Sequence, residues 1–285
     1  MNRKFFSVSL LIVLSFSLST LSGCGNKGTK DSDIAKKIQG TQPGNDKKTA
    51  TENGKNTGKN QFPEIKQCKS LLIVAEDRSG STHDHRKLTA DDYSKLIHQF
   101  VKENYGQVAV RVIGNPAPAE REFFILRIDP LKKYKPVPPI SAKMSVRAAV
   151  ISDNKKINIE NKQIMEENNN KIANFIEEII KPKIIQYKPY HNKDITDVKD
   201  ALQHLQIKTS ESLFRSYDNI DVLLISDGKH DASKLQTPVY FEPENPVNLY
   251  LIGWEEDKDI LKVSNIEEYD SFDSFMEAYY EKKCN

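Results

Sequence analysis

The sequence predicts an α/β fold with a mostly parallel sheet, and two observations support this class. Short, continuous apolar runs, typical of strands covered on both faces, occur at residues 71–75, 222–225 and 247–252. Stretches with apolar residues at helical spacing lie between these runs. Strands that alternate with helices in this way form parallel sheets.

The first run is followed by a predicted helix. Thr89 and Asp92 have the spacing of a capping box, which marks a helix start. Apolar residues at helical spacing then follow: Tyr93, Leu96, Ile97, Phe100 and Val101. We expect Gly106 to end this helix.

Two further strands should form a tight pair. Residues 107–114 alternate between apolar and polar, and residues 122–128 again read as a strand. Asn115 and Pro116 begin the short turn between them. Because strands joined by so short a turn run antiparallel, we expect one short antiparallel edge strand.

Residues 130–190 read as an elaboration of the fold. Prolines near Pro136 predict an extended or looping segment. Apolar residues from Ile164 to Ile180 then predict an amphipathic helix that ends at Pro182. Its apolar stripe is expected to pack on the sheet, with a partner-binding helix as the alternative.

The remaining helices complete a Rossmann-like, doubly wound arrangement flanked by helices. One helix is marked by Val198, Ala201, Leu202 and Leu205, and the last by Phe272, Phe275, Met276 and Tyr279. In such folds ligands bind beyond the carboxyl ends of the strands.

The N-terminus has the pattern of an export signal. Arg3 and Lys4 precede an apolar stretch at 5–21. The quartet ending in Cys24, Leu-Ser-Gly-Cys, resembles the lipobox of bacterial lipoproteins. The resemblance implies a signal peptide at 1–23, cleavage before Cys24 and attachment of palmitate-type acyl chains there, facing the periplasm or exterior of a bacterial cell envelope. A transmembrane anchor is the alternative, although the stretch is barely long enough to span.

Residues 24–66 read as the lipidated cysteine and a flexible tether, because they contain almost no apolar side chains. The whole chain carries +2, the signal +2 and the tether +4, which leaves −4 for the domain at 67–285. A mildly acidic domain argues against nucleic acid as a partner.

Three cysteines occur in the chain. With Cys24 used for the lipid, Cys68 and Cys284 remain at the two ends of the domain. An exported protein sits in an oxidising compartment, so we expect a disulfide between them, with two free thiols as the alternative.

Oxygen-bearing side chains follow two of the predicted strands. Asp77, Ser79 and Ser81 come directly after the run at 71–75, and Asp227 follows the run at 222–225. Thr196 lies at the start of the helix that carries Ala201 and Leu202. Hard oxygens at one point suit a hard divalent cation, Mg²⁺ or alternatively Ca²⁺ or Mn²⁺. Each residue alone is also an ordinary turn or cap residue.

Together these residues resemble the von Willebrand factor A (VWFA) domain. That family has an Asp-x-Ser-x-Ser loop, a Thr before a helix with an Ala-Leu pair, and an Asp-Gly after a later strand. These correspond to Asp77, Ser79 and Ser81, to Thr196, and to Asp227 with Gly228. The resemblance implies a complete metal-ion-dependent adhesion site in which a Glu or Asp of a protein partner completes the metal's coordination.

Several residues depart from the family pattern. Glu76 stands beside Asp77, Thr82 follows Ser81, and Asp194 lies in the approach to Thr196. Glu76 and Asp194 are expected to make the rim of the site more acidic, which would favour metal and disfavour an acidic partner.

Four histidines lie near these loops in sequence: His83, His85, His191 and His230. They would form a softer, second metal site if they converged. Because no pair has the spacing of a preformed helical site, we expect exposed loop histidines instead.

The resulting functional hypothesis is an anchored, exported binding protein and not an enzyme. One alternative is a metal-dependent phosphoester hydrolase with His83 or His230 as acid or base. The other is a structural component of a cell-envelope complex.

Overall fold

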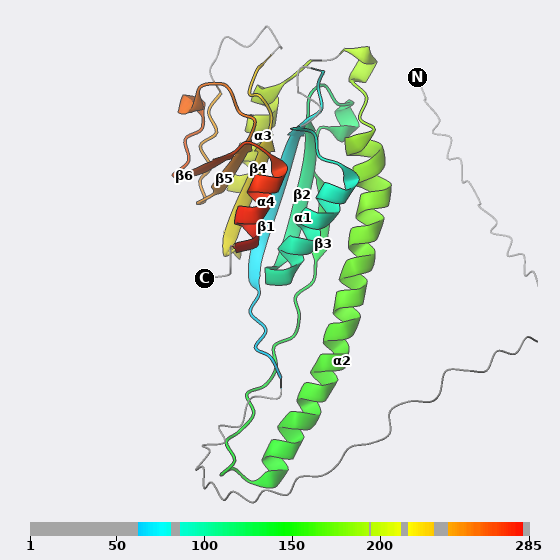
Figure 1. Cartoon of the computed structure of the whole chain (residues 1–285), viewed down its shortest axis with the longest axis vertical. Coiled ribbons are helices and arrows are strands. Elements are labelled where there is room, and N and C mark those ends of the chain that lie inside the picture. Colours follow the sequence, from blue (N-terminus) through cyan, green and yellow to red (C-terminus); the bar gives the residue numbers. More distant parts are fainter. Residues whose placement is uncertain (1–61, 81–85, 194, 212–215, 231–238, 282–285) are drawn as a thin grey trace, which may run out of the picture. The chain divides into compact units, whose positions relative to one another are not determined.

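The computed structural model describes residues 62–80, 86–193, 195–211, 216–230 and 239–281, all within one compact unit. A six-stranded sheet in the order β3-β2-β1-β4-β5-β6 forms its centre (Figure 1). Every neighbouring pair is parallel except β2 and β3, so the predicted α/β class and its antiparallel edge strand are confirmed. The strands are β1 (Cys68–Asp77), β2 (Asn104–Ile113), β3 (Phe124–Ile128), β4 (Asn219–Ile225), β5 (Asn248–Ile252) and β6 (Asn265–Tyr269).

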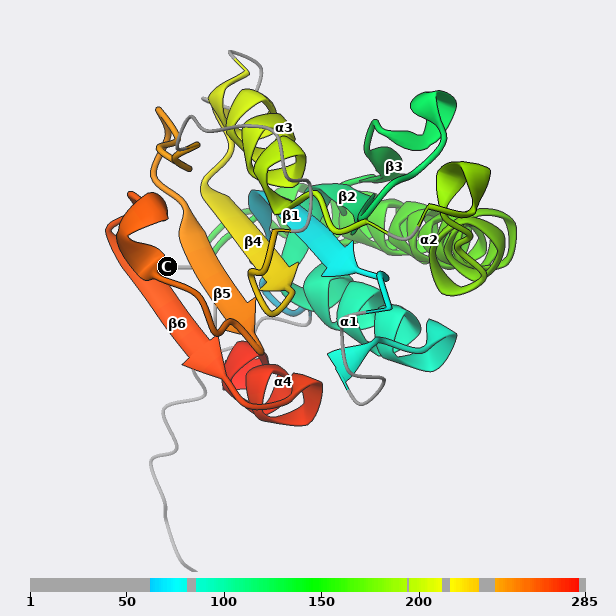
Figure 2. The same ribbon diagram turned by 90° about the horizontal axis from the view of Figure 1, so that it is seen from above.

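Helices cover both faces of the sheet (Figure 2). The α-helices are α1 (Ala90–Glu103), α2 (Met144–Phe175), α3 (Val198–Ser210) and α4 (Phe272–Glu281). A π-helical segment, Ile176–Ile185, continues α2, and short 3₁₀ turns lie at Pro118–Glu120, Tyr190–Asn192 and Lys258–Ile260. Among the described residues, no helix is long and apolar enough to cross a membrane.

The central strand β1 serves two hydrophobic cores because its side chains alternate between the faces. Leu72 and Val74 join the core under α1, α4 and the end of α2. Leu71 and Ile73 join the core under α3. This two-sided burial explains why the strand is apolar without interruption.

The first helix begins as predicted but ends earlier. Thr89 and Asp92 form the expected capping box, whereas the helix stops at Glu103 with Asn104 as its C-cap. Gly106 is therefore not the helix end; it lies inside β2 with φ +125°. A Cβ there would lie 2.4 Å from the carbonyl oxygen of Ser70, so glycine is required by the close approach of two strands.

The helix of the elaboration is longer than predicted at both ends. It starts at Met144, about twenty residues before Ile164, and Pro182 lies within the π-helical continuation instead of ending the helix. The apolar stripe detected in the sequence is the part that packs on the sheet side, where Ile172, Phe175 and Ile180 are buried. The earlier half lacks an apolar stripe, so hydrophobic spacing did not reveal it.

That earlier half of α2 is held by three buried asparagines seven residues apart: Asn154, Asn161 and Asn168. Each side-chain amide pairs with the backbone N–H and C=O of one residue in the extended segment after β3. The partners are Lys135, Lys132 and Asp129 respectively, at 2.7–3.1 Å. Seven helical residues rise about 10.5 Å and three extended residues about 10 Å, so the two spacings match. We call this set the asparagine ladder.

Replacing Asn161 by Ala should loosen the ladder locally. The N–H and C=O of Lys132 lose their partner, which costs about 2 kcal/mol at roughly 1 kcal/mol per hydrogen bond. We expect the backbone amide of Lys132 to exchange about 30-fold faster, measured by hydrogen–deuterium exchange of peptides covering 129–135. Asn170, exposed on the same helix, supplies the control Asn170→Ala. Equal exchange in the two variants would contradict the role of the ladder.

The signal peptide, Cys24 and most of the tether lie outside the described residues, as do Ser81, Thr82, Asp194 and Cys284. Cys68 forms a disulfide. The other two cysteines of the chain, Cys24 and Cys284, are not described, so the pairing of Cys68 with Cys284 stays a prediction.

Candidate metal site

The loop after β1 positions the first two oxygen donors. The N–H of Ser79 donates to Asp77 Oδ1 at 2.8 Å, which bends the chain sharply after the strand. The N–H of Arg78 donates to the carbonyl of Ile113 at 3.2 Å, so the turn begins while the chain is still tied to β2. As a result the Asp77 carboxylate and the Ser79 hydroxyl are both buried at the carboxyl end of β1.

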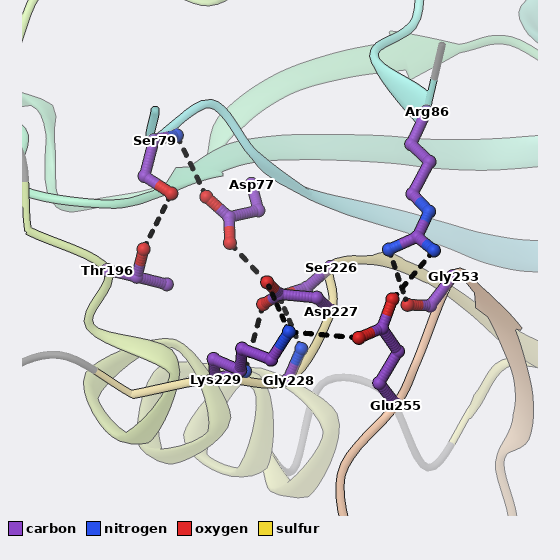
Figure 3. Close-up of polar contacts among 10 residues, drawn as sticks. All are labelled: Asp77, Ser79, Arg86, Thr196, Ser226, Asp227, Gly228, Lys229, Gly253 and Glu255. Carbon is purple, nitrogen blue, oxygen red and sulfur yellow. Dashed lines mark hydrogen bonds and ion pairs between the residues drawn. The ribbon is translucent and has the colours of Figure 1, made fainter. Parts of the chain in front are cut away.

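Thr196 reaches the same point from a distant segment. Its hydroxyl donates to Ser79 Oγ at 2.6 Å and is fully buried (Figure 3). The N-cap of α3 is Asp197, which accepts from the N–H of Asp200 at 3.0 Å. Thr196 is thus not the helix cap, and its side chain is directed at the loop after β1.

The loop after β4 supplies the remaining donors. Asp227 is buried, and its Oδ1 accepts from the N–H of Lys229 at 2.9 Å. Ser226, which the sequence did not single out as a site residue, donates its hydroxyl to Asp77 Oδ2 at 3.1 Å. The structure therefore brings together four of the five predicted residues, Asp77, Ser79, Thr196 and Asp227, while Ser81 lies outside the described residues.

A charged cluster borders the site. Glu255 pairs with Arg86 at 2.8 Å and with Lys229 at 2.9 Å, and Lys229 Nζ lies 3.8 Å from Asp227 Oδ2 (Figure 3). Hydrogen bonds from Lys229 and Arg86 lower the pKa of Glu255 to about 2, and the same contact with Glu255 raises the pKa of Lys229. Sequence spacing carried no signal for this cluster, because its members come from three separate loops.

Glu76 does not contribute to the rim, contrary to the expectation from the sequence. Its side chain is fully buried on the other face of β1 and accepts from Tyr93 Oη and the N–H of Leu88, both at 2.6 Å. Arg78 lies 2.9 Å from it. Burial raises the pKa of Glu76, and Arg78 opposes that rise. Adjacent strand residues point to opposite faces, so Asp77 faces the site and Glu76 faces away.

The loop histidines give no second metal site among the described residues. His191 is exposed and has φ 54°. The ring of His230 is largely buried, its Nδ1 lies 3.7 Å from Asp197 Oδ1, and neither ring nitrogen has a hydrogen-bond partner among the described residues. His83 and His85 lie outside that part of the chain.

The described donors suit a small, hard cation. Two carboxylates and hydroxyl oxygens are the ligand types that Mg²⁺ prefers, with Ca²⁺ or Mn²⁺ as alternatives. The described part of the chain has no group of three or more His, Cys, Asp or Glu placed to hold a metal. Carboxylate and hydroxyl oxygens disfavour soft metals, whose preferred ligands are thiolate sulfur and imidazole nitrogen.

Comparison with known proteins gives little beyond this geometry. No protein-family model matches the chain, and no curated protein matches it. One similar solved structure is proximal thread matrix protein 1 from the mussel byssus, 13% identical with a TM-score of 0.36. The match covers 77% of this chain and 47% of that one, so this chain spans about half of that protein's length. The function must therefore be argued from the chemistry of the site.

Proposed function

We propose that this chain is a VWFA-type binding protein, exported and anchored to a membrane by lipid at Cys24, which recognises a protein partner through a divalent metal ion. The observation that carries the proposal is the hydrogen bond of 2.6 Å between Thr196 and Ser79. These residues are 117 positions apart, and both hydroxyls are buried beside the Asp77 carboxylate. Hydroxyls meeting at the carboxyl ends of strands suit ligand binding more than core packing.

The donor set favours an ion that still accepts a ligand from outside. Asp77, Ser79, Ser81, Thr196 and Asp227 would hold the ion, and only two of these five side chains carry charge. A bound Mg²⁺ would offer an incoming carboxylate a position to coordinate. A partner's Glu or Asp would therefore complete the site, whereas a cage of carboxylates would repel it.

The rim also favours an acidic partner. Arg86 and Lys229 lie beside the site and are bridged by Glu255. An approaching carboxylate would compete with Glu255 for these two cations. Complementary charges at a rim act mainly on the association rate and on the choice of partner.

The proposal predicts metal-dependent capture of a partner from the cell envelope. The full chain, solubilised from membranes, should retain one or more envelope proteins in Mg²⁺ and release them in EDTA. Ser79→Ala and Asp227→Ala should each lose that capture in Mg²⁺, because each removes a metal ligand. Captured proteins are identified by mass spectrometry.

Ser70→Ala is the matched control. Ser70 is buried like Ser79, but it lies near the start of β1, where its hydroxyl donates to Asn104 Oδ1. This variant should capture the partner as the wild type does. Capture that is indifferent to EDTA and to both site variants would defeat the proposal.

A further inference from the structure

The first half of α2 and the extended segment after β3 form an arm that leaves the sheet at the end opposite the metal site. The last residue of β3, Ile128, pairs with Gly106 near the start of β2. The candidate site lies at the opposite end of the strands, where β1 and β4 finish. α2 has 32 residues, so it is about 48 Å long and extends well beyond the sheet (Figure 1).

The tip of this arm, residues 131–152, is basic and apolar. It contains five Lys or Arg residues and no Asp or Glu, although the domain as a whole is acidic. Two of the five, Lys132 and Lys135, pair with Glu160 and Asp153 of α2. Ile140, Met144 and Val146 are large apolar residues that are 66%, 86% and 48% exposed. Lys143 and Arg147 form no ion pair with any described residue. Exposed apolar side chains flanked by cations are typical of surfaces that bind anionic lipid.

The described chain begins at this arm. The ring of Phe62 packs on Tyr134 with 5.1 Å between centroids. Residues 62–67 also line an open groove together with residues 133–137 of the arm. The tether that leads back to Cys24 therefore joins the domain on the side of the arm, away from the metal site.

We propose that the arm tip lies against an anionic lipid bilayer, with Met144 and its apolar neighbours among the headgroups. The proposed function enters this proposal in one respect: the lipid anchor decides which bilayer the tip meets. The contact of the tip with lipid does not depend on the anchor. The asparagine ladder keeps the arm extended, and the opposite end of the domain presents Asp77, Ser79 and Thr196 away from the lipid surface. The arm thus holds the domain in one orientation on the bilayer, with the metal site facing its partner.

Tryptophan quenching tests this placement in the full chain. The protein has a single tryptophan, Trp254, which is buried beside Gly228 at the site end. Met144→Trp adds a second at the tip. In vesicles of phosphatidylcholine and phosphatidylglycerol with brominated acyl chains, the emission from position 144 should be quenched, and Trp254 in the wild type should not.

Two variants serve as matched controls. Met165→Trp places the same residue on the same helix about 31 Å from Met144, and it should escape quenching. Each basic side chain strengthens contact with an anionic surface about fivefold. Replacing both Lys143 and Arg147 by Gln in the Met144→Trp protein should therefore shift the tip about 25-fold toward the free state and remove most of the quenching.

The possible results distinguish three things: lipid contact at the tip, lipid attachment at Cys24 and self-association of the chain. Quenching at position 144 no stronger than that of Trp254 would overturn the proposal, whether or not the protein is anchored. Quenching at 144 with an unmodified Cys24, seen by mass spectrometry, would retain the tip contact and refute the lipid anchor. Sedimentation that shows a dimer lost in Met144→Glu would assign the tip to a second copy of the chain and overturn the lipid proposal.

Discussion

Replacing Asp77 by Ala is expected to abolish binding of divalent metal at the site. Asp77 is one of two carboxylates there, and its oxygens accept from the N–H of Ser79 and the hydroxyl of Ser226. Loss of residues that merely support a ligand costs about 10–100-fold in metal affinity, so losing this ligand should cost more than about 100-fold. Mg²⁺ at 100 times its dissociation constant should stabilise the wild type by about 2.7 kcal/mol and the variant by less than about 0.4 kcal/mol.

Calorimetric titration with Mg²⁺, and quenching of Trp254 by Mn²⁺, would measure this loss directly. The control is Asp221→Asn, because Asp221 is a buried carboxyl group near the start of β4, remote from the site. It should retain metal binding even where it lowers stability. Equal metal affinity in the wild type and Asp77→Ala would remove the basis of the proposed function.

Replacing Arg78 by Met should cause the largest loss of stability, about 3–5 kcal/mol at pH 7. The change leaves the fully buried carboxyl group of Glu76 without its cation, and breaking a buried pair from one side carries a cost of this size. Arg78 also donates to the carbonyl of Leu88 and lies between Asp77 and Ser79. The variant should therefore bind metal more weakly as well, because the loop after β1 loses its attachment to the start of α1.

The stability lost in Arg78→Met should increase as the pH rises. Burial already raises the pKa of Glu76 above its usual 4.5, and removal of Arg78 raises it further. The folded protein then holds a proton that the unfolded chain has released. The penalty is thus small below about pH 4.5 and grows as the pH rises through the pKa of the folded variant.

Urea denaturation at pH 4.5 and pH 7 would measure both effects. Adding Glu76→Gln to Arg78→Met should restore most of the stability at pH 7, because no buried charge then remains. A loss that is the same at both pH values, or that the second substitution does not relieve, would show that Arg78 acts through something other than Glu76.

Local patterns were sufficient wherever one element buries its own apolar side chains. The uninterrupted run at 71–75 identified β1, and Thr89 with Asp92 identified the start of α1. The earlier half of α2 was missed because Asn154, Asn161 and Asn168 are polar, and hydrophobic spacing detects only apolar stripes. The edge strand β6 was missed for a similar reason, since Asn265–Tyr269 is only partly buried and carries two glutamates.

The sequence by itself determined the order of the strands and helices other than β6, and it placed Asp77 and Asp227 at the carboxyl ends of two buried strands. These features depend on neighbours within a few residues, where periodicity and turn chemistry act. Only the tertiary structure decided that Thr196 meets Ser79, that Ser226 joins them, and that Glu76 turns inward to Arg78 and Tyr93. Such pairings unite segments far apart in the chain, and their geometry arises only once the sheet and its helices have packed.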